Sequence, residues 1–362
     1  MATAIVGGVL AGKPGNGGNA WSRLSFVLGL RRLGFDALFV EQLESMAPEG
    51  SEYFEQVCAQ FGVEGYLVFD APSPELVART EAASLLLNVG GHLTLEIFKS
   101  APRVRVYIDD DPGYTQFWHV RGLLGERLAD HDFHFTFGEN IGRPACSVPT
   151  GGIDWRPLRP PVLLDEWPVA DGARGRFTTV ASWRGAYGRV EADGRTLGQK
   201  AHEFRRFVEV PERIPQKFEI ALAIDPADAA DGTLLRNHGW NLVDPLAVAA
   251  SPDDFRGYVQ GSGAEFSVAQ GIYVETECGW FSDRTTRYLA SGKPALVQDT
   301  GFSSNLPTGK GLIAFRTLDE AAAGAEAIMR DYDLHAEVAR SLAVEYFDSD
   351  KVLGRLLEEV GV

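Results

Sequence analysis

The stretch GWFSDRTTRYLASGKPALVQDTGFSSNL, residues 279–306, decides the fold of this chain. Its first half predicts a helix that has Ser282 as its N-cap and that ends at Gly292, two residues before Pro294. The apolar residues 295–297 then predict a buried strand, which runs into a second glycine loop. A helix that leads directly into a buried strand is typical of an α/β fold with a parallel sheet.

The start of this predicted helix is a candidate phosphate site. Backbone N–H groups and the positive end of the helix dipole attract anions at a helix N-terminus. Arg284 adds a positive charge in the first turn, and Arg287 adds another or pairs with a carboxylate. The residues predicted to bind the phosphates of a ligand here and in the following glycine loop are Ser282, Asp283, Arg284, Thr285, Asp299, Thr300 and Gly301.

The length and composition indicate two globular domains. The 362 residues exceed what one hydrophobic core usually serves. Hydrophobic residues make up 45% of the chain and charged residues 23%, which is ordinary for a globular protein. The formal net charge of -16 disfavours general binding to nucleic acid or to an anionic membrane, although a few arginines can still hold one diphosphate.

The cysteines and the hydropathy pattern bear on location. Cys58, Cys146 and Cys278 are far apart and have no CxxC spacing, so neither a disulfide framework nor a zinc site is predicted. No apolar run approaches the ~20 residues of a membrane span. The chain also enters a strand pattern without a charged leader segment. We therefore expect a cytoplasmic protein without a membrane span.

The N-terminal segment predicts the first unit of a Rossmann-like domain. Residues 4–10 and 37–40 read as strands, and residues 21–33 have the apolar spacing of a helix. The glycine loop between the first strand and the helix does not match GxGxxG, so it gives little support to a dinucleotide site and could be a tight turn only. Because ligands lie at the carboxyl ends of strands in open α/β sheets, we expect this loop to line a cleft. The residues placed there are Gly17, Gly18 and Asn19.

Strands alternate with helical stretches in both halves of the chain, which predicts parallel sheets. Six prolines between residues 144 and 168 exclude a helix or a central strand, so this connector holds the domain boundary. The predicted fold class is α/β, with two Rossmann-like domains facing a cleft. Its parts are an N-terminal domain over residues 1–155, a C-terminal domain over residues 156–344 and a C-terminal helix over residues 345–362.

Three side chains that follow predicted strands are candidate general bases. His92 follows two glycines, and Asp109 and Asp111 belong to a run of three aspartates. A carboxylate or an imidazole beside a cleft can take a proton from a hydroxyl group. Clustered carboxylates can instead bind Mg²⁺ or cap the next helix, and a lone histidine is often structural. Tyr114 follows the aspartates and is expected at the same cleft.

These motifs resemble those of nucleotide-sugar glycosyltransferases of the GT-B type, and locally those of retaining family four. Gly17 and Gly18 with the following helix resemble the family's Gly-Gly loop, although Phe35 stands where the family usually has histidine. Residues 290–294, ASGKP, resemble its AxGxP signature, and residues 299–301 resemble the loop after it. The resemblance covers nearly the whole chain in architecture and is local in its motifs.

Basic residues of the second half resemble the donor clamp of the same family. Arg184 and Lys200 resemble the arginine and lysine that hold the donor diphosphate, and Trp183 lies where it could stack on a base or a sugar. The family's two glutamates, separated by seven residues, correspond here to Gly279 and Arg287. This departure leaves the choice between retention and inversion open. The sequence resembles a divergent bacterial branch, whose acceptors include small molecules such as natural products.

The resemblance implies transfer of a hexosyl group from a nucleoside diphosphate to a small-molecule acceptor, as in secondary metabolism. It implies no cofactor besides the nucleotide sugar and no metal ion, because helix dipoles and basic residues stabilise the leaving diphosphate. It also implies that the N-terminal domain binds the acceptor, that the C-terminal domain binds the nucleotide-sugar donor, and that the C-terminal helix crosses back to the first domain. We expect no nucleic acid partner. Two alternatives remain open: a nucleotide-sugar epimerase of the same fold, and a non-catalytic sugar-nucleotide-binding partner of another transferase.

Overall fold

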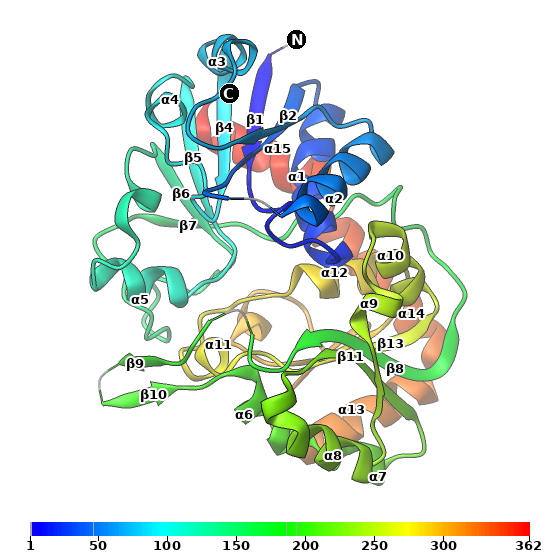
Figure 1. Ribbon diagram of the computed structural model, residues 1–362. Helices are drawn as coiled ribbons and strands as arrows, with labels where there is room; N and C mark the ends of the chain where they lie inside the picture. The colour runs from blue at the N-terminus through cyan, green and yellow to red at the C-terminus, as the bar shows by residue number, and fades with distance from the viewer. Residues whose placement is uncertain (1, 46, 186, 193) are drawn as a thin grey trace.

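The computed structural model describes residues 2–45, 47–185, 187–192 and 194–362. Two parallel β-sheets, each with helices packed against it, form two domains that are stacked one above the other in Figure 1. The N-terminal half of the chain makes the upper domain and most of the C-terminal half makes the lower one. The predicted α/β class with two parallel sheets is confirmed.

The N-terminal sheet has seven strands among the described residues, in the order β3-β2-β1-β4-β5-β6-β7, and all neighbouring strands are parallel. The strand order reverses between β1 and β4, where open α/β sheets form a ligand crevice. The strands are β1 (Thr3–Gly7), β2 (Asp36–Gln42), β3 (Gly65–Val68), β4 (Ala83–Val89), β5 (Val104–Asp109), β6 (Phe133–Thr136) and β7 (Trp155–Pro157). The helices are α1 (Gly17–Arg32), α2 (Pro48–Gln60), α3 (Pro74–Glu81), α4 (Glu96–Ser100), α5 (Tyr114–Val120) and η1 (Gly125–Leu128).

The C-terminal sheet repeats this architecture with six parallel strands in the described part of the chain, ordered β12-β11-β8-β13-β14-β15. Its strands are β8 (Ala173–Ser182), β11 (Lys217–Ala223), β12 (Asn241–Val243), β13 (Ser262–Ser267), β14 (Ala295–Gln298) and β15 (Leu312–Phe315). An antiparallel hairpin of β9 (Val190–Ala192) and β10 (Arg195–Leu197) projects beside it (Figure 1).

Short and long helices connect these strands. They are α6 (Lys200–Phe204), η2 (Arg205–Phe207), α7 (Val210–Arg213), η3 (Pro226–Asp228), α8 (Ala229–Asn237), α9 (Pro245–Val248), α10 (Pro252–Gln260), α11 (Gly271–Glu275), α12 (Asp283–Ala290), η4 (Phe302–Ser304), α13 (Leu318–Arg330), α14 (Tyr332–Tyr346) and α15 (Ser349–Val360). The last of them, α15, lies in the upper domain near α1 (Figure 1). A Cβ on Gly29 of α1 would lie 2.5 Å from Leu353 Cδ1, so the glycine lets the two helices approach closely.

Aromatic side chains join the two domains. Trp21 of α1 lies edge-on to Trp167 of the connector, with ring centroids 5.2 Å apart, and Trp167 contacts Phe255 of α10 in the same way at 6.0 Å. The Trp21 indole N–H also donates a hydrogen bond of 2.8 Å to the carbonyl oxygen of Pro252. These contacts are buried and fix α1 of one domain against α10 of the other.

Three local predictions differ from the structure. Helix α1 begins at Gly17, four residues before the predicted start, because the Asn16 side chain accepts a hydrogen bond from the Asn19 N–H at 3.0 Å and caps the helix. The connector contains strand β7, so the predicted boundary after residue 155 falls within a strand. Pro157 is tolerated there because β7 is an edge strand. The predicted helix over residues 199–208 is divided into α6 and the 3₁₀ turn η2.

None of the helices in the described residues combines the length and the apolar character that crossing a membrane requires.

Candidate functional site

A cleft of about 950 Å³ lies between the two sheets. The N-terminal domain contributes Asp110 and Asp111 after β5 and eight residues from the glycine loop and the first turns of α1, which are Lys13, Pro14, Gly15, Asn16, Gly18, Asn19, Ser22 and Arg23. The C-terminal domain contributes the segments that follow β8, β11 and β12, and the start of α12. These segments belong to connections that leave the carboxyl ends of parallel strands, which is where such folds bind ligands.

Helix α12 presents its N-terminus to this cleft, as the sequence predicts. Ser282 is buried and acts as the N-cap, and its Oγ accepts a hydrogen bond of 3.2 Å from the Arg284 N–H. Asp283 lines the cleft and forms an ion pair of 2.9 Å with Arg287 one turn further on. Thr285 is buried and faces the protein interior rather than the cleft. The helix start therefore brings backbone N–H groups and Arg284 to the cleft.

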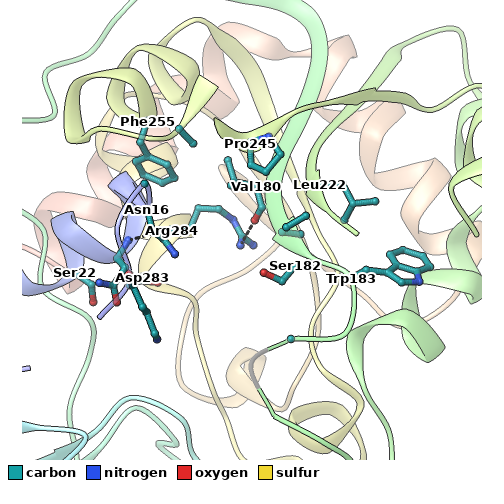
Figure 2. Close-up of a pocket in the computed structure, with 18 of the residues that line it drawn as sticks. Asn16, Ser22, Val180, Ser182, Trp183, Leu222, Pro245, Phe255, Asp283 and Arg284 are labelled. Carbon is teal, nitrogen blue, oxygen red and sulfur yellow. Dashed lines mark hydrogen bonds between the residues drawn. The ribbon is translucent and has the colours of Figure 1, made fainter. Parts of the chain in front are cut away.

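Arg284 is held rigidly at the centre of the cleft (Figure 2). Its guanidinium donates hydrogen bonds to Glu265 Oε1 at 2.7 Å, to the Val180 carbonyl oxygen at 2.9 Å and to Ser267 Oγ at 2.7 Å. Within the described residues these bonds use three of the five N–H groups of the guanidinium, which leaves two. A fixed arginine with two N–H groups to spare is suited to bidentate binding of a phosphate.

Trp183 and Arg184 follow β8 and both line the cleft. Trp183 is buried, and its indole N–H donates a hydrogen bond of 2.8 Å to Asp231 Oδ2, so this ring is held in the domain core. Arg184 is more than half exposed and makes a two-pronged ion pair with Asp228, at 2.6 and 2.8 Å. Arg184 is thus the accessible cation on this side of the cleft.

Lys200, at the start of α6, is buried. Burial and the positive charge of the neighbouring Arg284 lower the pKa of Lys200 to about 7, against the attraction of Glu265. It adjoins the Arg284–Glu265 pair but is not among the described residues that line the cleft. Burial thus destabilises the protonated form of Lys200, and an anion bound next to it would stabilise that form.

The loop over residues 299–301 supports the site without lining it, as far as the described residues show. Asp299 accepts a hydrogen bond of 2.9 Å from the Gly301 N–H and forms an ion pair of 3.0 Å with Arg316. The Thr300 hydroxyl donates to the Trp280 carbonyl oxygen at 2.6 Å. Gly301 has a φ of 92°, in the left-handed region that glycine favours. The loop therefore organises the segment that precedes α12.

The glycine loop of the N-terminal domain has two different roles. Gly18 and Asn19 line the cleft. Gly17 instead contacts the other domain: its N–H donates to the Ala249 carbonyl oxygen at 2.8 Å, and a Cβ on it would lie 2.0 Å from the Ser251 carbonyl oxygen. Only glycine fits at this contact between the domains.

The three aspartates after β5 have three different environments. Asp109 is buried and accepts hydrogen bonds of 2.7 Å from each of Thr115, Gln116 and Thr136, so its carboxylate is occupied by structural donors. Asp110 lines the cleft and forms an ion pair of 2.8 Å with the buried Arg23. Burial raises and Arg23 lowers the pKa of Asp110, with lowering as the net result.

Asp111 lines the cleft and differs from both neighbours. The hydroxyls of Tyr273 and Tyr187 donate to its two carboxylate oxygens, at 3.0 and 3.1 Å. Burial and the negative charge of Asp110 raise the pKa of Asp111 to about 7. A carboxylate with this pKa at the wall of a cleft has the properties of a general base.

His92 and Tyr114 lie close to this region, but neither is among the described residues that line the cleft. Burial and the charges of Arg23 and Arg127 lower the pKa of His92 to about 4, so its ring is neutral at pH 7. Tyr114 is fully buried, and its hydroxyl donates to Gln270 Oε1 at 3.2 Å. Of the three candidate bases, the structure brings only Asp111 to the cleft wall.

Several cleft residues were missed by sequence reasoning. Lys13, Ser22, Arg23 and Trp280 line the cleft, in addition to Asp110. Arg23 lies four residues after Asn19 on α1, so helical spacing from the predicted cleft residue could have found it. Trp280 had no such signal, because an aromatic residue before a helix is usually part of the core.

Within the described residues, no group of three His, Cys, Asp or Glu side chains is arranged to hold a metal ion.

The structure resembles known glycosyltransferases. No protein family model matches the chain, and no curated protein matches it. The alpha-glucosyltransferase AGT in complex with UDP has a TM-score of 0.67 at 11% identity, with 100% of both chains covered. HepE from Anabaena in complex with UDP and glucose has a TM-score of 0.63 at 11% identity and the same coverage. AviGT4, a glycosyltransferase involved in avilamycin A biosynthesis, has a TM-score of 0.60 at 11% identity, covering 100% of this chain and 97% of that one. The chain therefore has the two-domain GT-B fold of these glycosyltransferases.

Proposed function

We propose that this protein is a glycosyltransferase that moves a hexosyl group from a nucleoside diphosphate sugar to a small-molecule acceptor. The observation that carries the proposal is that Arg284, at the N-terminus of α12, and Asp111, after β5, line the same cleft from different domains. A site for a leaving diphosphate and a carboxylate for a proton thus face the same space. The neighbours of the same fold solved with UDP make a UDP-sugar the first donor to test.

In the proposed reaction an acceptor hydroxyl oxygen forms a bond to the anomeric carbon of the donor sugar. The bond between that carbon and the diphosphate oxygen breaks, and the diphosphate leaves with the electron pair. The α12 N-terminus, Arg284 and Arg184 stabilise its charge, with Lys200 as a further cation. Asp111 accepts the proton of the hydroxyl group. Basic residues and a helix dipole supply the charge stabilisation, so we propose that transfer needs no metal ion.

The acceptor is proposed to be a small molecule. The formal net charge of -16 opposes the approach of a polyanion such as DNA. An alpha-glucosyltransferase of the same fold has been solved in complex with UDP and a 13-mer DNA, so a nucleic acid is the alternative acceptor to test. A comparison of duplex DNA with neutral small molecules as acceptors tests this part of the proposal.

The donor site can be tested by calorimetry with UDP. We expect the protein to bind UDP, and Arg184→Ala to weaken binding roughly tenfold because a charge-assisted contact to phosphate is lost. Arg213→Ala is a matched control, because Arg213 is also half exposed and paired with a carboxylate, Glu209, but lies outside the cleft. If UDP and other nucleoside diphosphates fail to bind at millimolar concentration, the donor site is wrong.

Turnover distinguishes the alternatives. A glycosyltransferase releases UDP from UDP-glucose and forms a glycoside with the acceptor. Conversion of UDP-glucose to another UDP-sugar without any acceptor would identify an epimerase instead. Binding of the donor with no turnover, in the presence of acceptors that bind, would identify a non-catalytic partner protein. The anomer of the glycoside reports whether transfer retains or inverts configuration.

A further inference from the structure

The segment Thr276–Trp280 belongs to the C-terminal domain but is attached to the N-terminal one. The Thr276 carbonyl oxygen accepts a hydrogen bond of 3.1 Å from the Ser147 N–H, and the Cys278 carbonyl oxygen accepts one of 3.0 Å from the Asn140 N–H. Trp280 itself forms a backbone bridge with Gly138. The position of Trp280 relative to the N-terminal wall of the cleft is therefore fixed.

Trp280 is half-buried and lines the cleft. One face of its indole is stacked on the Tyr273 ring, with centroids 4.5 Å apart and planes at 30°. Tyr273 is fully buried, and its hydroxyl donates to Asp111 Oδ1 at 3.0 Å. One tyrosine thus braces both the indole and the carboxylate, and holds them at a set distance on the acceptor side of the cleft.

We propose that Trp280 is the platform of the acceptor subsite, and that it selects an acceptor whose reacting hydroxyl is carried on a sugar ring. The apolar C–H face of the ring would lie on the indole while one of its hydroxyls donates to Asp111. This inference rests on the proposed transfer reaction and names the acceptor class of that same cleft.

The remaining lining of this wall favours a polyhydroxylated ring over a flat aromatic acceptor. Besides Asp110 and Asp111, the N-terminal wall of the cleft carries the polar side chains of Lys13, Asn16, Asn19 and Ser22. Each offers a donor or an acceptor to further hydroxyl groups. A planar phenol would cover the indole but leave these polar groups without partners, which costs binding free energy. A sugar ring satisfies both surfaces.

The test is to measure the binding of methyl glycosides by saturation-transfer difference NMR in the presence of saturating UDP. Methyl glucosides, galactosides and mannosides are compared with 4-nitrophenol as the flat aromatic. We expect at least one glycoside to bind and to act as an acceptor with UDP-glucose. Trp280→Ala should weaken its binding about tenfold because the stacking surface is lost, whereas Trp280→Phe should retain most of it.

UDP affinity, measured in parallel by calorimetry, should be the same in both variants because the diphosphate site is not altered. Binding of 4-nitrophenol in preference to every glycoside would overturn the acceptor class. If Trp280→Ala binds the glycoside as well as the unmodified protein does, Trp280 is not the acceptor platform. The same holds if Trp280→Ala weakens the binding of UDP-glucose alone and leaves the binding of UDP and of the glycoside unchanged. A protein that binds neither UDP nor UDP-glucose would instead refute the proposed function itself.

Discussion

The two faces of the cleft are built alike and arrange their charged groups differently. Each face mixes acidic and basic side chains: Lys13 and Arg23 with Asp110 and Asp111 on the N-terminal face, and Arg184 and Arg284 with Asp225, Asp244 and Asp283 on the C-terminal face. On both faces the lining residues follow parallel strands. The C-terminal face presents Arg284 and Arg184, with Lys200 adjoining. The N-terminal face presents Asp111, bound by tyrosine hydroxyls, next to an Asp110 that is already paired. In the proposed reaction, the same topology supplies cations for the leaving group on one side and a carboxylate for the proton on the other.

The largest effect should come from removing the carboxylate. Asp111→Asn keeps the shape of the side chain, although one of the two tyrosine hydroxyls must turn to accept from the new amide N–H, and the amide cannot accept the acceptor proton. We expect kcat to fall by ~10²–10⁴, the usual contribution of a general base, while UDP affinity stays the same. Steady-state kinetics and calorimetry on the same samples measure both quantities.

Asp154→Asn is the matched control, because Asp154 is exposed, lies outside the residues described as lining the cleft, and forms an ion pair of 3.5 Å with Arg156. Its kcat should equal that of the unmodified protein. An Asp111→Asn variant with full turnover would show that Asp111 is not the base. The proposed division of roles between the two faces would then be wrong.

The next largest effect should come from the buried cation of the other face. Lys200→Met should weaken UDP binding by ~10- to 100-fold, because a buried positive charge that adjoins Arg284 and would attract the diphosphate is lost. It should also raise the free energy of unfolding of the free protein. The folded protein holds Lys200 at a pKa of about 7 against 10.5 for the unperturbed side chain, so a proton on it favours the unfolded state.

The sign of this stability effect depends on pH. The loss in free energy of unfolding that is caused by burying protonated Lys200 is complete below about pH 7. It decreases as the pH rises and vanishes above 10.5. Thermal denaturation of Lys200→Met at neutral and at high pH measures it. Lys217→Met, at an exposed position of β11, should change neither stability nor UDP binding. Equal UDP affinity in Lys200→Met would remove Lys200 from the donor site.

The pH profile of kcat/KM sharpens the comparison, since both faces titrate near neutrality. Asp111, which faces Asp110, Asp109, Lys13 and two tyrosines, must be ionised to accept a proton, so activity should fall about tenfold per unit below pH 7. Lys200 must be protonated to bind phosphate, so activity should also fall above about pH 7.

Lys200→Arg tests the alkaline limb, because arginine stays charged throughout this range. We expect that limb to disappear while the acid limb remains. Both pKa values fall within the range from about pH 6 to about pH 9. A kcat/KM that stays constant over this range would contradict both assignments.

The sequence predicted the architecture of the fold because hydrophobic periodicity and glycine loops are local signals. The α12 N-cap at Ser282 and the parallel strands around it are read from neighbouring residues. The hairpin of β9 and β10 was missed, because its few residues carry little periodicity and its partners, such as α5, are distant in the chain.

The site was harder to predict than the fold, because its chemistry depends on contacts between distant segments. The run of three aspartates gave no means to tell Asp109, which is fully hydrogen-bonded, from Asp111, which reaches the cleft. That distinction depends on Tyr187 and Tyr273, more than 70 residues further along the chain. Trp280 likewise acquires its place only through the backbone bridge to Gly138.

The smallest effect should come from loosening the contact between the two faces. In Gly17→Ala the new Cβ would meet the Ser251 carbonyl oxygen at 2.0 Å, so α1 and α10 must separate locally. We expect a loss of ~1–3 kcal/mol in the free energy of unfolding, as for other overpacked contacts, measured by urea denaturation. Transfer should fall several-fold, because Asp111 moves away from the donor face, while UDP affinity changes little.

Gly354→Ala is the matched control, since Gly354 lies within helix α15 and nothing lies within 4 Å of its Cβ position. Alanine there should be neutral or raise stability by up to ~1 kcal/mol through helix propensity. If Gly17→Ala lowers UDP affinity as strongly as it lowers transfer, the donor site extends onto the N-terminal face. The charges of the two faces would then act together on the diphosphate, rather than separately on leaving group and proton.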